Sequence, residues 1–354
     1  MSREMNKYKS TGNRGFFDEE ENLSKLAVIG NPLEMIGSVV DFEMFRNTLE
    51  TSLLNREKKS NAGAKPFDVL MMFKVLILQR YYGLGDTQLE YQIIDRISFK
   101  KFLGLESGDK VPDEKTVWAF RERLTNEGLV EKLFLQFNDY LNSKELIINE
   151  GKMVDASFTV APRQRNTRDE NKKIKEDKGV DLWNDKPNKK KHKDIDARWT
   201  KKNGETFYGY KNHAKVDTKS KFIDKYKVTD ASVHDSQTLD DLLEEGDKGQ
   251  DFHADSAYTG EAQEKVISKY KMNNKVHEKG YKNKPLTDLQ KANNKEKSRT
   301  RARIEHVFGF MEQSMNGLIV KSIGIKRATG IIGLINLTYN LFRYEQVIRL
   351  NILK

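Results

Sequence analysis

The chain has 354 residues, more than one typical domain, so we expect a sizeable core and at least two structural units. It contains no cysteine, which excludes disulfides, thiolate nucleophiles and cysteine-based zinc or iron–sulfur sites and fits the reducing cytoplasm. The 63 Lys and Arg residues outnumber the 53 Asp and Glu residues, and the net charge of +10 favours a polyanionic partner.

The first 66 residues are predicted to be a lead-in followed by a linker. Residues 1–23 lack the apolar core of a signal sequence, a helix is expected at 41–54, and SNAGAKP at 60–66 is typical of a linker. The densest apolar run, 67–82, is interrupted by charged and amide side chains. We therefore predict a buried helix there and no membrane partner.

Residues 67–144 have helical periodicity throughout and are predicted to form an all-α DNA-binding domain. Within it, PDEKTVWAFRERL at 112–124 has Pro and two acids where a helix begins. Several side chains lie mostly off its apolar face and could contact DNA in a helix-turn-helix manner. They are Lys115, Trp118, Arg121 and Arg123. An ordinary amphipathic core helix explains the pattern equally well.

From residue 145 to 354 short β-rich runs alternate with helical patterns, and apolar stripes at helical spacing close the chain. This alternation predicts a mixed α/β domain. A basic insert is expected around 163–205, because residues 151–230 carry 22 basic and 13 acidic side chains and so hold most of the excess charge. A solvated, partly disordered Lys-rich segment is the alternative interpretation of this insert.

Three carboxylates have surroundings that suggest chemistry. Asp155 in KMVDASF and Asp255 in FHADSAYTG are predicted at or near strand ends, and Glu305 in TRARIEHVFGFMEQ beside the apolar stripe of a helix. Each has an ordinary explanation, since Asp commonly caps a turn and Glu305 can pair with Arg301 four residues earlier. If the three converge at the margin of one sheet, they could instead hold two divalent cations about 4 Å apart.

Carboxylate oxygens suit Mg²⁺ or Mn²⁺. In phosphodiester chemistry one such ion activates a water or a 3′-hydroxyl and the other stabilises the departing oxygen, so no covalent protein nucleophile is needed. The chain has neither cysteine nor a GxSxG motif, which disfavours acyl transfer.

Five motifs occur in a fixed order along the chain. They are VDAS at 154–157, GYKNH at 209–213, ASVHDS at 231–236, ADSAYTG at 254–260 and RARIEHVFG at 301–309. Together they resemble the DDE transposases of bacterial insertion sequences. The segment from residue 67 through FLGL at 102–105 to FRERL also resembles the helical N-terminal domain of those enzymes. The resemblance implies an α/β fold, a ribonuclease-H-like mixed sheet with flanking helices, preceded by the all-α domain.

The resemblance also implies roles for single residues. Asp155, Asp255 and Glu305 would be the catalytic, metal-binding residues holding two Mg²⁺ (or Mn²⁺) ions, and Arg301 would contact a DNA phosphate at the terminus being cut. Two positions depart from the family pattern: Ser298 stands where related groups have Tyr, and Glu312 where they often have Lys. Either other cations supply the local grip on DNA or this copy is impaired.

Two basic segments could follow the DNA backbone. One is 187–202, and the other is 271–304, with eleven basic and three acidic residues. The DNA-binding candidates outside the helical domain are Lys190, Arg198, Trp199, Lys211, Lys297, Arg299, Arg301 and Arg303. His213 and His234 are interpreted as structural, because the six histidines show no metal-ligand spacing, and Asp235 is expected to begin a helix.

We therefore expect a transposase that binds double-stranded DNA at the terminal inverted repeats of its element, frees 3′-hydroxyls and joins them to target DNA. Synapsis of two ends would require at least a homodimer. A metal-dependent nuclease of the same fold that does not join DNA, and a non-catalytic DNA-binding regulator, are the alternatives.

Overall fold

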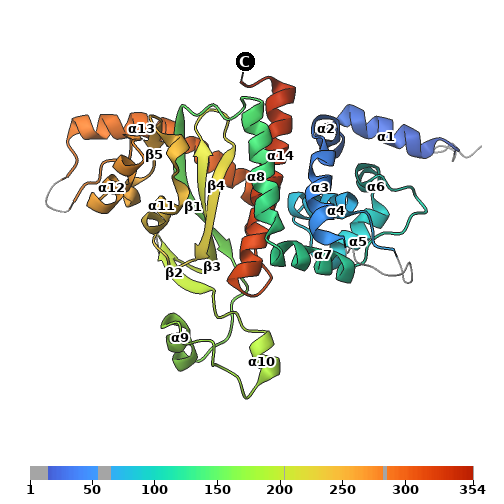
Figure 1. Ribbon diagram of the computed structural model, residues 1–354, viewed down its shortest axis with the longest axis horizontal. Coiled ribbons are helices and arrows are strands. Elements are labelled where there is room, and N and C mark those ends of the chain that lie inside the picture. The colour runs from blue at the N-terminus through green and yellow to red at the C-terminus, as the bar shows by residue number, and fades with distance from the viewer. Residues whose placement is uncertain (1–14, 55–64, 203, 282–284, 354) are drawn as a thin grey trace, which may run out of the picture.

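The computed structural model describes residues 15–54, 65–202, 204–281 and 285–353 (Figure 1). Residues 60–64 of the expected linker lie outside these ranges. The described chain forms a helical N-terminal region followed by a mixed sheet with helices on its flanks. Among the described helices, none combines the length and the apolar composition needed to cross a membrane.

The N-terminal region is built from short helices on an aromatic and aliphatic core. In chain order they are α1 (Asp18–Ile29), α2 (Pro32–Val39), α3 (Arg46–Leu53), α4 (Val69–Tyr81), α5 (Asp86–Asp95), α6 (Ile97–Leu103), α7 (Glu114–Asn126) and α8 (Leu129–Ser143), with a 3₁₀ turn at Phe42–Phe45. Asp68 begins α4 by accepting hydrogen bonds from the N–H groups of Leu70 and Met71, at 3.0 and 2.9 Å. Almost every side chain of α4 is buried, which explains why its sequence is apolar on all sides.

The sheet has the strand order of the ribonuclease-H-like fold. Its strands are β1 (Gly151–Val160), β2 (Arg198–Lys202), β3 (Glu205–Asp217), β4 (Ile223–Asp230), β5 (Asp251–His253) and β6 (Asn273–Asn274). Strands β4, β3 and β1 are antiparallel neighbours, β5 pairs parallel with β1, and β6 pairs parallel with β5. β2 pairs with the first residues of β3. The expected fold class is thereby confirmed.

The helices of the second region either flank the sheet or belong to an insert. They are α9 (Arg168–Lys175), α10 (Pro187–Lys191), α11 (Leu239–Leu242), α12 (Glu261–Lys269), α13 (Asp288–Gly309) and α14 (Ile325–Leu350), with 3₁₀ turns at Asp235–Thr238, Glu245–Asp247 and Ser256–Tyr258 and a π-helical turn at Phe310–Ser314. Figure 1 shows α8 and α14 side by side between the sheet and the remaining N-terminal helices, while α9 and α10 lie in an insert away from the sheet. A second apolar cluster joins β1 and β5 to α11 and α12.

Helix α14 ties the two regions together. It packs on α4, α7, α8 and β4, and most of its 26 residues are buried. Two of its buried polar side chains are paired: Asn336 exchanges amide hydrogen bonds with Asn212 of β3, at 2.7 and 3.1 Å. Asn340 donates to the Asn138 side chain of α8, at 3.0 Å. These bonds fix the register of α14 against its neighbours, because breaking one would leave a buried amide unsatisfied.

Two helical glycines predict opposite effects of the same substitution. A Cβ at Gly333 of α14 would lie 2.4 Å from the Tyr226 hydroxyl and 2.7 Å from a methyl of Val130, whereas a Cβ at Gly37 of α2 would meet no atom within 4 Å. We expect Gly333→Ala to lower the free energy of unfolding by about 1–3 kcal/mol through overpacking. Gly37→Ala should raise it by up to about 1 kcal/mol through helix propensity. Urea denaturation of both variants measures this, and a stabilised Gly333→Ala protein would contradict the packing.

Candidate active site

Asp155 lies in the middle of β1, not at the strand end that we expected. The strand runs to Val160 because the long β3 pairs with it continuously, from Lys152 to Val160. On its other side β1 pairs with β5 only as far as Met153, opposite His253. Asp155 therefore lies just beyond the last residue paired with β5, with only 15% of its side chain exposed.

Asp255 emerges beside Asp155 from the neighbouring strand. Because Met153 pairs with His253 in parallel, each aspartate follows two residues after the last pair and leaves at the same end of the strands. Asp255 begins the turn Ser256–Tyr258 by accepting a hydrogen bond from the N–H of Ala257, at 2.8 Å. Asp255 therefore caps a turn, as the sequence suggested. Only its Oδ1 accepts this hydrogen bond, and its Oδ2 does not take part in it.

The pKa of Asp155 is raised because the side chain is buried and lies near a second carboxylate. Burial raises this pKa to about 6, the N–H of Ala156 opposes the rise, and the charge of Asp255 adds to it. The nearby Tyr258 hydroxyl is buried without a hydrogen-bond partner among the described residues. Its pKa is raised well above the usual value by burial and by Asp155, Asp235 and Asp255. An orphaned hydroxyl beside crowded carboxylates indicates a place for a missing polar or cationic partner.

Helix α13 brings Glu305 to the same place. The helix packs against β1 and β5 through a stripe that includes Ile304 and Val307, and the Glu305 side chain beside the stripe is 57% exposed. Arg301, one turn earlier, joins two of the acids: its Nη1 lies 3.3 Å from Asp155 Oδ2 and its Nη2 donates to Glu305 Oε1 at 2.6 Å. The pairing of Arg301 with Glu305 that the sequence allowed is therefore present, and it also reaches Asp155.

The donor set fits a hard divalent cation. Every candidate ligand atom is a carboxylate oxygen, and the acids are balanced locally by the Arg301 guanidinium, whose Nε is buried without a partner among the described residues. The three carboxylates do not all approach within 4.8 Å of one another in the described chain. Two ions about 4 Å apart would not require such convergence, because the three acids would share the ligation of two centres.

Comparison with known families assigns the chain. Residues 151–341, more than half of the sequence, match the family model of the transposase DDE domain. The chain belongs to the DDE transposases. Residues 21–123 match a second family model, described as a transposase domain, which covers most of the helical N-terminal region. No solved structure was found to match the chain.

Family membership establishes the class of chemistry. DDE transposases cut DNA phosphodiester bonds and transfer the strands with the help of divalent metal ions. DNA is therefore a partner of this transposase. The carboxylates assembled by β1, β5 and α13 lie inside the matched domain.

The cations of α13 differ in whether their side chains are hydrogen-bonded within the transposase. Lys297 donates to the carbonyl of Val276 at 2.9 Å, and Arg303 donates to the carbonyl of Thr218 at 2.7 Å. Arg299 is exposed. Ser298, one of the two departures from the family pattern, donates to the Asn294 carbonyl at 2.7 Å, and the other, Glu312, is exposed.

Two expected DNA contacts are buried in ion pairs. Arg121 was expected off the apolar face of its helix but is only 6% exposed, and its guanidinium bonds both oxygens of Asp86 at 2.7 Å. Lys211 is 7% exposed and pairs with Asp235 at 2.8 Å. Both cations are buried and paired with carboxylates of the same chain, and this burial argues against their contact with DNA. Lys115 and Arg123 on the same helix as Arg121 are exposed, as expected.

The insert presents the remaining candidates. Trp199 is 42% exposed with the Arg163 guanidinium 5.7 Å from its ring centre. Lys190 of α10 donates to the Val180 carbonyl at 2.7 Å, and Arg198 pairs with Asp177 at 2.7 Å. These contacts order the insert, and they leave Trp199 as its most open aromatic surface.

The two singled-out histidines are structural in the described chain. His213 is fully buried on β3, its Nε2 lies 2.9 Å from the Thr229 hydroxyl, and burial lowers its pKa to about 4. His234 precedes the turn that Asp235 begins and accepts from the Ser236 N–H at 3.3 Å.

Lys202 lies beside the candidate site, and the sequence reasoning did not single it out. It ends β2, lies 3.8 Å from Asp235 and 5.7 Å from the Phe158 ring centre, and its charge lowers the pKa of Asp155. It closes the basic segment 187–202, and its contacts with Asp235 and Phe158, which the sequence does not reveal, bring its charge near Asp155.

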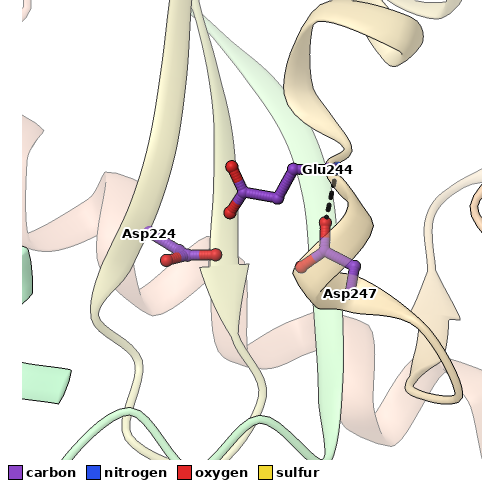
Figure 2. Close-up of side chains that lie close together, drawn as sticks. All are labelled: Asp224, Glu244 and Asp247. Carbon is purple, nitrogen blue, oxygen red and sulfur yellow. Dashed lines mark hydrogen bonds between the residues drawn. The ribbon is translucent and has the colours of Figure 1, made fainter.

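A second acidic cluster, also missed, lies between the start of β4 and the 3₁₀ turn Glu245–Asp247. Asp224, Glu244 and Asp247 offer oxygens within 4.8 Å of one another, and Figure 2 shows their carboxylates turned toward a common centre. The ammonium of Lys215 occupies that centre, at 2.9, 2.9 and 2.8 Å from the three acids. We therefore interpret this cluster as an internal ion network and not as the metal site of the transposase.

Proposed function

We propose that this transposase binds the ends of its element, hydrolyses a phosphodiester bond there to free a 3′-hydroxyl, and joins that hydroxyl to target DNA at one site formed by Asp155, Asp255 and Glu305. The observation that supports the proposal is the shared Arg301 guanidinium, which holds Asp155 and Glu305 together while Asp255 lies close enough to raise the pKa of Asp155. Carboxylates that compete for one cation are suited to hold divalent ions.

The side chains divide the work. Asp155, Asp255 and Glu305 would together hold two Mg²⁺ or Mn²⁺ ions, and Asp155 lies shielded from water between two strands and the helix. Such ions, when bound, lower the pKa of the attacking water or hydroxyl and stabilise the departing oxygen. Arg301, relieved of its role as internal counterion, would then be available for bidentate contact with a phosphate of the DNA end.

DNA grip would come from cations around this site. The exposed Arg299 and Lys202, together with the half-buried Lys297 and Arg303, extend the positive charge beside the carboxylates. These contacts are independent of base sequence and weaken with salt. Recognition of the element's own ends requires base contacts, which we assign to the helical region through exposed residues such as Lys115 and Arg123. We further propose a homodimer, because two ends must be held together for joint transfer.

The test is a strand-transfer assay. Purified full-length protein is incubated with labelled duplexes from both flanks of its coding sequence, supercoiled target DNA and Mg²⁺. We expect nicks that leave 3′-hydroxyls at the element ends and labelled products joined to the target. Cleavage without any joined product would favour the nuclease alternative, and DNA binding without cleavage in Mg²⁺ or Mn²⁺ would favour the regulator.

A further inference from the structure

A cleft of about 650 Å³ lies between the helical region and the segment that follows α13. Its walls are the end of α4, the start of α5, a face of α7 and residues 316–331. Gly83 permits the close approach of the two walls: its φ is +61°, and a Cβ there would lie 2.6 Å from Asn316 Cβ and 2.8 Å from the Met315 carbonyl. The cleft is therefore built at a direct contact between the regions.

The cleft is basic and partly apolar. Four cations line it against a single carboxylate: Arg80, Arg121, Lys321 and Arg327 against Asp86. Arg121 already neutralises Asp86 through two bonds of 2.7 Å, and Arg327 is held by Glu122 at 2.8 Å. Trp118 and Ile319, 49% and 53% exposed, also line it. The charge left over belongs to Arg80 and the exposed Lys321.

Arg80 has no ion-pair or hydrogen-bond partner for its side chain among the described residues. Its Nε is buried and unpaired. Burial, and then the charge of Arg121, lowers the pKa of Arg80 to about 10, and the charge of Asp86, which Arg121 already pairs, opposes this only in part. An uncompensated guanidinium is costly in a folded protein, so a position that retains one calls for an anionic partner from outside.

We propose that this cleft binds a phosphodiester group of the DNA backbone, with Arg80 as the principal donor and Lys321 as a second cation. The inference rests on the proposed function in that it takes DNA as the partner. The planar guanidinium suits bidentate contact with phosphate oxygens, and Trp118 at the opening offers an aromatic surface to the adjoining sugar or base.

The position of the cleft connects this contact to the active site. The segment that forms its far wall continues from α13, which carries Glu305. It is also bonded to the end of β1: the N–H of Val160 donates to the Leu318 carbonyl at 2.9 Å, and the N–H of Val320 donates to the Val160 carbonyl at 3.0 Å. A phosphate held in the cleft would thus set the DNA relative to the strand that carries Asp155.

The test compares DNA binding of Arg80→Gln, Arg80→Lys and a control, Lys132→Gln, which removes an exposed cation of α8 outside the cleft. Fluorescence anisotropy with a labelled duplex is recorded without divalent ions over a range of KCl concentrations. For Arg80→Gln we expect about tenfold weaker binding or more, and a slope of log affinity against log salt reduced by about 0.9. Arg80→Lys should recover part of the affinity.

Thermal unfolding separates this role from a structural one. Because Arg80 is unpaired and next to Arg121, Arg80→Gln should leave the unfolding midpoint of the DNA-free protein unchanged or higher. An equal affinity for wild type and Arg80→Gln, or an equal loss in Lys132→Gln, would overturn the proposal while leaving the transposase activity standing. Absence of any DNA binding by the wild type would instead defeat the proposed function. Stabilisation of wild type by inorganic phosphate, with DNA affinity unchanged in Arg80→Gln, would show a free-anion site and also overturn it.

The absence of native cysteine allows a direct second measurement. A fluorophore on Ile319→Cys, at the cleft, should change its emission when duplex is added, and one on Leu135→Cys, an equally exposed site on α8, should not. Unchanged emission at Ile319→Cys under saturating DNA would exclude the cleft as a contact surface.

Discussion

The substitution Asp155→Asn should abolish Mg²⁺-dependent cleavage while DNA binding remains. Asp155 is only 15% exposed, and neutralising it removes the ligand that β1 would contribute to the site. Loss of a metal ligand costs several kcal/mol of transition-state stabilisation, so we expect a fall of about 10³-fold or more. Asp255→Asn and Glu305→Gln should behave alike. A plasmid-nicking assay measures the rates, and full activity in any one variant would remove that residue from the site.

A matched control separates ligand loss from a change in charge. Glu312→Gln removes one exposed carboxylate from the turn that continues α13, seven residues after Glu305, and should leave cleavage intact. DNA affinity should be equal or higher in every one of these variants, because each removes a negative charge from a DNA-binding face. A parallel loss of cleavage in Glu312→Gln would show that the assay reports general charge or folding.

Metal preference supplies a second test of direct ligation. Asp255→Cys places a thiolate in a protein without other cysteines. Sulfur is a poor ligand for Mg²⁺ and a better one for Mn²⁺, so the variant should be inactive in Mg²⁺ and partly active in Mn²⁺. Equal inactivity in both ions, with Glu312→Gln active in both, would contradict a metal-binding role for Asp255.

The neighbourhood of the three acids could be predicted because it follows from order and local pattern. Asp155 and Asp255 each follow an apolar run, and Glu305 lies beside a stripe of helical spacing, so their elements were recognisable. The position of Asp155 within its strand was not. The extent of β1 depends on strands that are distant in the sequence. β3 pairs with β1 as far as Val160, whereas β5 pairs with it only as far as Met153. Local sequence carries no record of either partner's length.

The burial of two DNA-binding candidates in ion pairs has one physical origin. A basic side chain in a sequence shows its charge but not its counterion, and both Arg121 and Lys211 have theirs at a distance along the chain, in Asp86 and Asp235. Arg80 is the reverse case: it lies in an apolar run that predicts burial, it is half-buried, and its buried Nε has no hydrogen-bond partner among the described residues. Tertiary pairing decides which cations remain for DNA.

Lys215→Met should destabilise the fold more than any other single lysine substitution that we consider. Lys215 is fully buried and meets Asp224, Glu244 and Asp247 within 3 Å, and the acids Asp224 and Asp247 hold its pKa above the ordinary value against the effect of burial. Without it, Asp247 has no cationic partner among the described residues, and Asp224 keeps only Lys152, at 3.1 Å. Breaking a buried network from one side costs about 3–5 kcal/mol.

Lys225→Met is the control, because Lys225 is 36% exposed and lies 3.6 Å from Glu244 at the edge of the same cluster. It should cost under about 1 kcal/mol. Urea denaturation of both variants gives the comparison, and equal small losses would contradict the network.

The same variant also tests why this cluster is not a metal site. With the ammonium removed, three carboxylates with oxygens within 4.8 Å of one another remain around an empty centre, which is a donor set for Ca²⁺. We expect Ca²⁺ to raise the unfolding midpoint of Lys215→Met more than that of the wild type, since an ion that binds only the folded state stabilises it. An equal shift in the two proteins would mean that the ammonium does not fill this centre. The two carboxylate clusters differ in their internal cation, which is Lys215 among Asp224, Glu244 and Asp247 and Arg301 between Asp155 and Glu305.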